Sequence, residues 1–373
     1  MINRRAVLAG MGGVGAVLLG ATACSPAETT GAPTASSSAV GAVTVAGESA
    51  PCELVLLGTY GGPPIEADRA GIASALVVDG ATYVVDCGRG ATTQYTRAGL
   101  SYEALRSIFI THLHADHVAD YYNFFLLAGS VPNSHGDSIA GPVGVYGPGP
   151  AGGLPPKLGG GVAPTVAEAN PTPGIADLTE RCHEAYAYSS NVFMRNAGVR
   201  DIRTLAAVQE IVIPNTDASF ENTSPPMAPF EIMRDDKVRV SAILVPHGPI
   251  FPAFAFRFDT AYGSVTFSGD TTYSDNLVTL AHGTDVLVHE ATNLEGAVNT
   301  SPELRSHALE SHVEVQQVGA IAQRCGAKRL VVSHFADRAR TPVDTQQWHE
   351  WASRGFDGDV IIGADLQRIP VGT

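Results

Sequence analysis

The sequence predicts an α/β protein in which two similar halves each form a β-sheet covered by helices. Short runs of β-branched and other apolar residues, separated by glycines, come first in each half and predict strands. Segments with apolar residues at spacings of three and four follow and predict helices. A chain of 373 residues that is 45% hydrophobic is long enough to bury the core of such a layered arrangement.

The first 24 residues predict an export signal. Arg4 and Arg5 precede an uncharged apolar stretch, and small residues then lead to Cys24. This order is typical of a twin-arginine signal peptide. The Ala-Thr-Ala before Cys24 fits both a lipoprotein box and an Ala-x-Ala cleavage site. We therefore expect an exported protein, which is either a lipoprotein anchored to the membrane through Cys24 or a secreted or periplasmic protein.

A linker and one catalytic domain make up the rest of the chain. Residues 25–50 are mostly Ser, Thr, Ala, Gly and Pro, cannot bury a core and predict a flexible linker. Residues 51–373 form the domain. Between 131 and 235 the periodic patterns weaken, and we interpret this stretch as an insertion with one helical segment at 175–198. Side chains of that segment are expected either to wall the substrate pocket or simply to pack: Tyr186, Tyr188, Phe193 and Arg195.

The elements alternate along the domain as the fold class requires. The expected strands are 53–58, 73–80, 81–88, 106–112, 238–248, 253–260, 263–271, 285–292 and 329–335. The expected helices are 92–100, 115–129, 175–198, 311–326 and 345–355. The segment 359–371 completes the chain.

Charge and cysteine content limit the classes of partner and site. Removal of Arg4 and Arg5 with the signal leaves 21 of the 23 basic residues against 37 acidic ones. Such a chain repels polyanions unless a local basic patch overrules the total, so nucleic acid is not expected as a partner. Four cysteines besides Cys24 lack any C-x-x-C spacing, which argues against a zinc ribbon and favours buried thiols, with one disulfide left open.

The segment THLHADH (111–117) concentrates metal-ligand side chains. His112 and His114 are two residues apart, so they point the same way on an extended segment, while Asp116 and His117 follow in a turn that opens the next helix. Zinc accepts this mixture of nitrogen and oxygen ligands, and a second zinc about 3.5–4 Å away is usual in two-metal hydrolases. Three separately satisfied core histidines are the alternative, which this density disfavours.

Further ligand candidates stand at the ends of three predicted strands. His247 follows SAILVP, Asp270 follows GSVTFSG and His334 follows RLVVS. Placement at carboxyl-terminal strand ends is what loops converging over one sheet edge require. Together with THLHADH, these residues predict a dinuclear metal site.

These motifs resemble those of the metallo-β-lactamase superfamily, and most closely ribonuclease Z and the arylsulfatase-like exported enzymes. The segments that carry the resemblance besides THLHADH are LGT (57–59), VDCGRGATTQ (85–94), SGDT (268–271), VHEAT (288–292) and SHF (333–335). The resemblance implies an αββα sandwich, with two β-sheets flanked by helices. This sequence departs from the family pattern at Arg89, a position where the family commonly has an acidic residue.

The resemblance also implies two Zn²⁺ ions, with other divalent metals as alternatives. The implied ligand sets are His112, His114 and His247 for one ion and Asp116, His117 and His334 for the other, bridged by Asp270. Asp86 would orient the ligand loop. The residues expected to act in catalysis are Asp116, Glu290 and His312. Glu290 would orient His312 at the start of a later helix, and His312 would protonate the leaving group; His307 is the alternative donor.

The function expected from these features is that of an exported dinuclear zinc hydrolase. It would cleave a phosphodiester, sulfate ester or related small-molecule ester by attack of a metal-bound hydroxide. A ribonuclease Z-type tRNA 3′-processing endonuclease is the alternative; His247 and Asp270 are only 23 positions apart, which leaves no room for a tRNA-gripping arm there. An iron-dependent dioxygenase and a non-catalytic binding lipoprotein are further alternatives, and we expect a homodimer.

Overall fold

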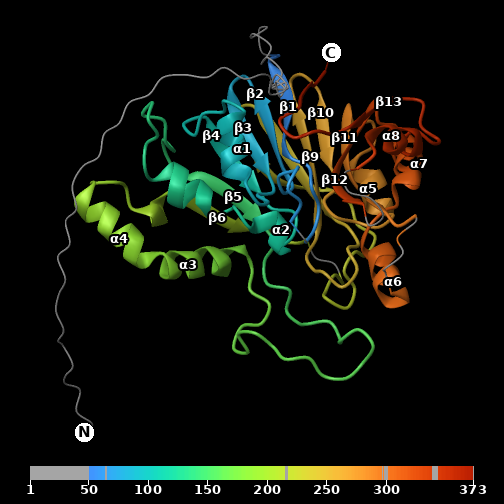
Figure 1. Cartoon of the computed structure of the whole chain (residues 1–373), viewed down its shortest axis with the longest axis horizontal. Coiled ribbons are helices and arrows are strands. Elements are labelled where there is room, and N and C mark those ends of the chain that lie inside the picture. The colour runs from blue at the N-terminus through green and yellow to red at the C-terminus, as the bar shows by residue number, and fades with distance from the viewer. Residues whose placement is uncertain are drawn as a thin grey trace, which may run out of the picture. The chain divides into compact units, whose positions relative to one another are not determined.

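The computed structural model describes residues 50–372 except 64, 215–216, 296, 298–300 and 338–342 (Figure 1). The expected signal peptide and all but the last residue of the expected linker lie outside these residues. Within the described part of the chain, no helix combines the length and the apolar character needed to cross a membrane.

The first sheet contains seven of the described strands, in the order β14-β1-β2-β3-β4-β5-β6. Its strands are β1 (Cys52–Gly58), β2 (Ala73–Val78), β3 (Ala81–Val85), β4 (Leu105–Phe109), β5 (Val143–Gly147), β6 (Ala206–Glu210) and β14 (Arg368–Pro370). Pairing is antiparallel from β14 to β3 and parallel from β3 to β6.

The second sheet has the order β13-β12-β11-β10-β9-β8-β7 among the described strands. Its strands are β7 (Phe230–Arg234), β8 (Val238–Leu244), β9 (Phe254–Thr260), β10 (Ser264–Phe267), β11 (Val286–Asn293), β12 (Arg329–Asp337) and β13 (Asp359–Ile362). Pairing is antiparallel from β7 to β10 and parallel from β10 to β13. The segment 359–371 thus contributes one strand to each sheet.

Three apolar cores hold four layers together. Side chains such as Leu54 and Phe256 fill the space between the sheets. On the outer face of the first sheet, Tyr95 and other residues pack under α1 (Ala91–Arg97) and α3 (Ile175–Ala185). On the outer face of the second sheet, Trp348 and its neighbours lie under α5 (Asp275–Leu280), α7 (Val315–Cys325) and α8 (Thr345–Ala352). Figure 1 shows this helix–sheet–sheet–helix order, which confirms the fold expected from the sequence.

The stretch 131–235 is not wholly an insertion, which corrects the sequence interpretation. It supplies β5 and β6 to the first sheet and β7 to the second. β5 (VGVYG) and β6 (AAVQE) are short and poor in large apolar side chains, so their pattern is weak although their backbones complete the sheet. The expected helix 175–198 is two helices, α3 and α4 (Ala187–Asn196).

Two other helices also differ from expectation. The segment 115–129 forms α2 (Ala115–Val118) and the π-helix η1 (Phe124–Gly129), with a turn between them. The turn arises because the backbone there bonds to the β3–α1 loop: Cys87 N donates to the His117 carbonyl, and Asp120 N donates to the Cys87 carbonyl. The segment before α7 forms a separate helix, α6 (Pro302–Ser311), and a short 3₁₀ helix, η2 (Ile202–Thr204), precedes β6. The four described cysteines are free, and only Cys182 is not buried.

Candidate metal centre

The structure brings all seven predicted ligands together at one edge of the two sheets. His112 and His114 follow β4, Asp116 and His117 lie in α2, and His334 lies in β12. His247 follows β8 and Asp270 follows β10. The carboxyl ends of the parallel strands β10, β11 and β12 meet at the same edge, which places these residues opposite the loop after β4.

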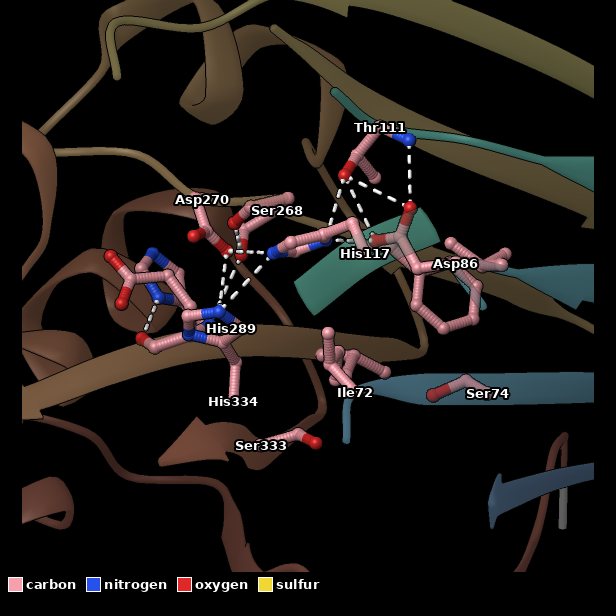
Figure 2. Close-up of a pocket in the computed structure, with 15 residues that line it drawn as sticks. Ile72, Ser74, Asp86, Thr111, His117, Ser268, Asp270, His289, Ser333 and His334 are labelled. Carbon is pink, nitrogen blue, oxygen red and sulfur yellow. Dashed lines mark hydrogen bonds and ion pairs between the residues drawn. The ribbon is translucent and has the colours of Figure 1, made fainter. Parts of the chain in front are cut away.

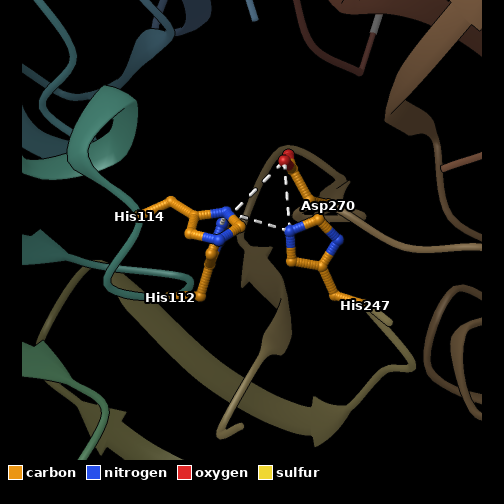
Figure 3. Close-up of side chains that lie close together, drawn as sticks. All are labelled: His112, His114, His247 and Asp270. Carbon is orange, nitrogen blue, oxygen red and sulfur yellow. Dashed lines mark hydrogen bonds and ion pairs between the residues drawn. The ribbon is translucent and has the colours of Figure 1, made fainter. Parts of the chain in front are cut away.

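The first group surrounds one oxygen of Asp270 (Figure 3). His112 Nε2 lies 3.0 Å from His114 Nδ1, which lies 3.1 Å from His247 Nε2. Asp270 Oδ2 is 3.9 Å from His112 Nε2 and 3.7 Å from His247 Nε2. These four atoms come from three separate segments of the chain and face one common point.

The protonation of these histidines favours a cation at that point. His247 Nδ1 donates to the Ser311 carbonyl at 2.8 Å, so its Nε2 carries a lone pair. Burial lowers the pKa of His247 to about 3 and lowers the pKa of His112 well below its ordinary value. Neutral imidazole nitrogens about 3 Å apart repel each other unless a proton or a cation lies between them, and a metal ion can satisfy all three at once.

The second group surrounds the other oxygen of Asp270, and Figure 2 shows its His117 and His334 beside that carboxylate. Asp270 Oδ1 lies 3.4 Å from His117 Nε2 and 3.2 Å from His334 Nε2, and these two nitrogens are 3.2 Å apart. Asp116 Oδ2 is 3.5 Å from His117 Nε2 and 3.4 Å from His334 Nε2. Gly62 N donates to Asp116 Oδ2 and holds this carboxylate in place.

Both groups fit a divalent ion. Four ligand atoms placed tetrahedrally at about 2.0–2.2 Å from an ion are about 3.3–3.6 Å from one another. The interatomic distances quoted for the two groups, 3.0 to 3.9 Å, bracket this value. Because Asp270 gives one oxygen to each group, its carboxylate is placed to bridge two ions. The two groups could therefore hold two metal ions. Histidine and aspartate ligands suit zinc and several other divalent metals.

Asp86 and Thr111 position the histidines of both groups. Asp86 Oδ2 accepts a hydrogen bond from His117 Nδ1 at 2.8 Å, and Asp86 Oδ1 accepts from the Thr111 backbone at 2.8 Å. Thr111 Oγ1 is also 3.1 Å from His112 Nδ1. Burial lowers the pKa of His117, but the Asp270 and Asp86 carboxylates outweigh it and hold that pKa well above its ordinary value. A cation bound at Nε2 would displace this proton.

A β-bulge aims His334 into the second group. In the parallel pairing of β11 with β12, Glu290 pairs with Ser333 and Ala291 with Phe335, so His334 is the extra residue. Its φ of 51° lies in the left-handed region, where a histidine is uncommon and signals a functional constraint. Gly61 makes room for the ring, because a Cβ at this position would lie 2.3 Å from His334 Nδ1.

Glu290 and His312 lie beside both groups. Glu290 Oε2 is 3.3 Å from His312 Nδ1, and Glu290 Oε1 accepts from the Val313 backbone at 2.9 Å. The His312 ring lies between those of His247 and His334, with centroids 5.1 and 5.8 Å away. The sequence predicts that His312 begins a helix. In the structure it lies instead between α6 and α7. The alternative donor, His307, is on α6 and is absent from the described clusters.

Comparison with known proteins gives several ribonuclease Z relatives and solved structures of similar fold. Ribonuclease Z of Mycobacterium avium (strain 104) is 29% identical, and that of Mycobacterium bovis (strain BCG / Pasteur 1173P2) is 27% identical; each match covers 86% of this chain and 98% of the relative. The crystal structure of the short form of human tRNase Z matches with a TM-score of 0.55 and 21% identity, over 86% of this chain and 99% of that one. A family model described as anti-Pycsar protein Apyc1 matches residues 66–123.

The crystal structure of YhfI from Bacillus subtilis, a metallo-β-lactamase fold protein, matches with a TM-score of 0.55 and 17% identity, over 86% of this chain and 99% of that one. This chain is a metal-dependent hydrolase with the metallo-β-lactamase fold. The same sequence motifs that resemble the superfamily come together in space as the two ligand groups. Its likeness to ribonuclease Z agrees with the resemblance seen in the sequence.

These comparisons correct the expectation that nucleic acid is not a partner of this hydrolase. The matched relatives are named as nucleases, and one of the solved structures is a tRNase. The expectation failed because the net charge of the sequence is an average over the whole surface and does not describe the local charge at the site. Metal ions held by a ligand set such as this one add positive charge that a count of charged residues in the sequence leaves out.

Three positioning features of this hydrolase are not predicted by the sequence analysis. Thr111 belongs to the THLHADH segment, and a threonine before two ligand histidines is a usable signal for its role. The carbonyl of Ser311 and the small residue at Gly61 carry no sequence pattern that announces them. Both act through backbone position, which only the folded chain sets.

Proposed function

We propose that this metallo-β-lactamase-fold hydrolase is a dinuclear metal phosphodiesterase whose substrate is RNA, with cleavage at the 3′ side of a tRNA precursor as the reaction to test first. The observation that supports it is the placement of Asp270, which gives one oxygen to each ligand group, with His312 beside both. The similarity to ribonuclease Z extends over nearly the whole relative, which supports the choice of substrate.

Two bound divalent ions, zinc in the first instance, would activate water and offset the negative charge that develops on the phosphoryl oxygens. The residues of this chain supply the rest. Ser311 and Asp86 fix the orientation of His247 and His117, so the ligand atoms are in place before substrate arrives. Asp116 is held by Gly62 N in the second group. Glu290 holds the His312 ring where it can protonate the departing oxygen.

The test is turnover of a tRNA precursor that carries a 3′ trailer. Metal-loaded wild-type protein should release the trailer and leave a mature-length tRNA, whereas Asp270→Ala should not. The same transcript without a trailer is the matched substrate control. Intact precursor at high enzyme concentration, together with cleavage of bis(4-nitrophenyl) phosphate, would contradict RNA as substrate while retaining the phosphodiesterase activity.

An ester of a small aromatic molecule, a phosphodiester or a sulfate ester, is the second candidate. It is favoured by a cavity beside His114 whose lining among the described residues contains no Asp, Glu, Lys or Arg. A substrate whose body is small and apolar fits such a cavity. Comparison of kcat/KM for bis(4-nitrophenyl) phosphate, 4-nitrophenyl sulfate and the tRNA precursor ranks the candidates directly.

A further inference from the structure

A cavity of about 340 Å³ opens beside the first ligand group. His114, which supplies Nδ1 to that group, forms part of its wall, and the neighbouring Leu113 forms another part. The volume falls within the range of roughly 300–1,000 Å³ found for small-molecule sites. The cavity is therefore large enough for one ring system attached to the reacting group, and it shares the His114 side chain with the first ligand group.

The lining is apolar and stiff. Phe220, Phe251 and Leu154 contribute large apolar side chains, and several prolines, among them Pro173 and Pro252, contribute saturated rings that fix the backbone φ. His114 and Thr172 supply its polar side chains. A charged phosphoryl group would lose solvation here without a compensating partner, so it must stay at the ligand groups.

The cavity wall is tied to the ligand loops. Ile250, which lines the cavity, donates its backbone N–H to the His247 carbonyl at 3.0 Å. The opposite wall comes from the stretch between β5 and α3 and from Phe220. The ring of Phe220 packs against the backbone of Gly153, where an added Cβ would come within 2.3 Å of its Cε1 atom. Gly153 therefore lets Phe220 lie close to the wall.

The side chains considered as pocket walls from the sequence lie elsewhere. Tyr186 stacks on Tyr122, with ring centroids 5.7 Å apart, and Tyr188 on α4 is 86% exposed. Neither these nor Phe193 and Arg195 line the cavity. Phe193 is therefore a matched control for Phe220, because it is an aromatic residue of the same stretch that lies away from the cavity wall.

We propose that this cavity binds an aromatic ring carried by the substrate next to its reacting phosphoryl or sulfuryl group. The inference rests on the proposed function for the identity of that group. Flat rings stack favourably on aromatic and apolar walls, and both a nucleobase and a simple aryl group offer such a face. A sugar would leave most of its hydroxyls without partners in this lining.

Two matched pairs of ligands test the ring without requiring turnover. Binding to metal-loaded protein is measured by calorimetry for phenylphosphonate against methylphosphonate, and for cytidine 5′-monophosphate against ribose 5-phosphate. The two members of each pair carry the same kind of anionic group, and only one of them carries an aromatic ring. Wild-type protein should bind the ring-bearing member of at least one pair about ten- to a hundredfold more tightly, the usual effect of one stacked ring.

Phe220→Ala should reduce that preference to about twofold or less, with the affinity for methylphosphonate and the metal content unchanged. Gly153→Ala, which displaces the same ring by contact, should weaken the preference in the same direction. Phe193→Ala should leave it as in wild type. Preference in the nucleotide pair identifies a nucleobase, and preference in the phosphonate pair alone identifies an aryl group.

Equal affinity within both pairs for wild-type protein, or a preference that survives Phe220→Ala, would overturn the proposal. Hydrolysis of bis(4-nitrophenyl) phosphate is followed in parallel as the readout of the proposed function. A ring preference in a protein that hydrolyses no phosphodiester would retain the cavity assignment and reject the activity. Hydrolysis of the phosphodiester without any ring preference would retain the proposed activity and reject the cavity assignment.

Discussion

Replacing His312 by alanine separates a proton donor from a metal ligand. His312 Nδ1 lies 3.3 Å from Glu290 Oε2, and the ring lies between His247 and His334 without belonging to either group around Asp270. His312→Ala should therefore keep the full metal content. Turnover should fall because the leaving oxygen loses its acid.

The expected loss of rate follows from the removal of the general acid by His312→Ala. A positioned general acid contributes about 10²–10⁴ in rate, which is about 3–5 kcal/mol of activation free energy. The loss should appear in full for an alkoxide leaving group and should stay below about tenfold for a nitrophenolate, which scarcely needs protonation. Stability should fall by only about 1–3 kcal/mol, because the buried Glu290 Oε2 loses a neighbour while Oε1 keeps its bond to Val313 N.

The assay compares kcat for the tRNA precursor and for bis(4-nitrophenyl) phosphate in wild type and variant, with metal measured on the same samples. His307→Ala on α6 is the matched control, and it should behave as wild type. Equal losses on both substrates would assign His312 to structure or to substrate binding. Loss of metal would make His312 a ligand and would refute its role as the proton donor.

Three further results are expected. Elemental analysis of the wild-type protein should give about two divalent ions per chain. Asp270→Ala should reduce the metal content to one ion or fewer and should also abolish activity. A variant that kept both ions would exclude Asp270 as the bridge. Gly61→Ala should weaken the second site about 10–100-fold by pushing on the ligand histidine beside it, whereas Gly141→Ala, where a Cβ meets open space, should not. Export remains a proposal: replacing Arg4 and Arg5 by lysine should retain the protein in the cytoplasm of a native host, and unchanged export would exclude the twin-arginine route.

Local sequence pattern was enough to find the ligands because each of them lies in or next to a segment with a clear apolar pattern. His247 and Asp270 follow strands, as expected, whereas β12 continues past His334 to Asp337, so His334 lies at a bulge inside its strand and not at the strand end. The strands β5, β6 and β7 could not be found in this way. They are short and partly exposed, and their pairing is decided by neighbouring strands that lie far away in the sequence.

The sequence by itself determined which side chains are candidate metal ligands, the two-sheet architecture and the likeness to ribonuclease Z. Only the tertiary structure decided how those side chains are aimed. The bulge that turns His334 inward depends on the pairing of β12 with β11, and the room for its ring depends on Gly61 from a distant loop. The wall of the cavity beside His114 likewise includes a contact between Phe220 and Gly153, which are far apart in the sequence. Ligand identity is a property of single residues, whereas orientation and cavity shape arise from contacts between segments that the linear sequence keeps apart.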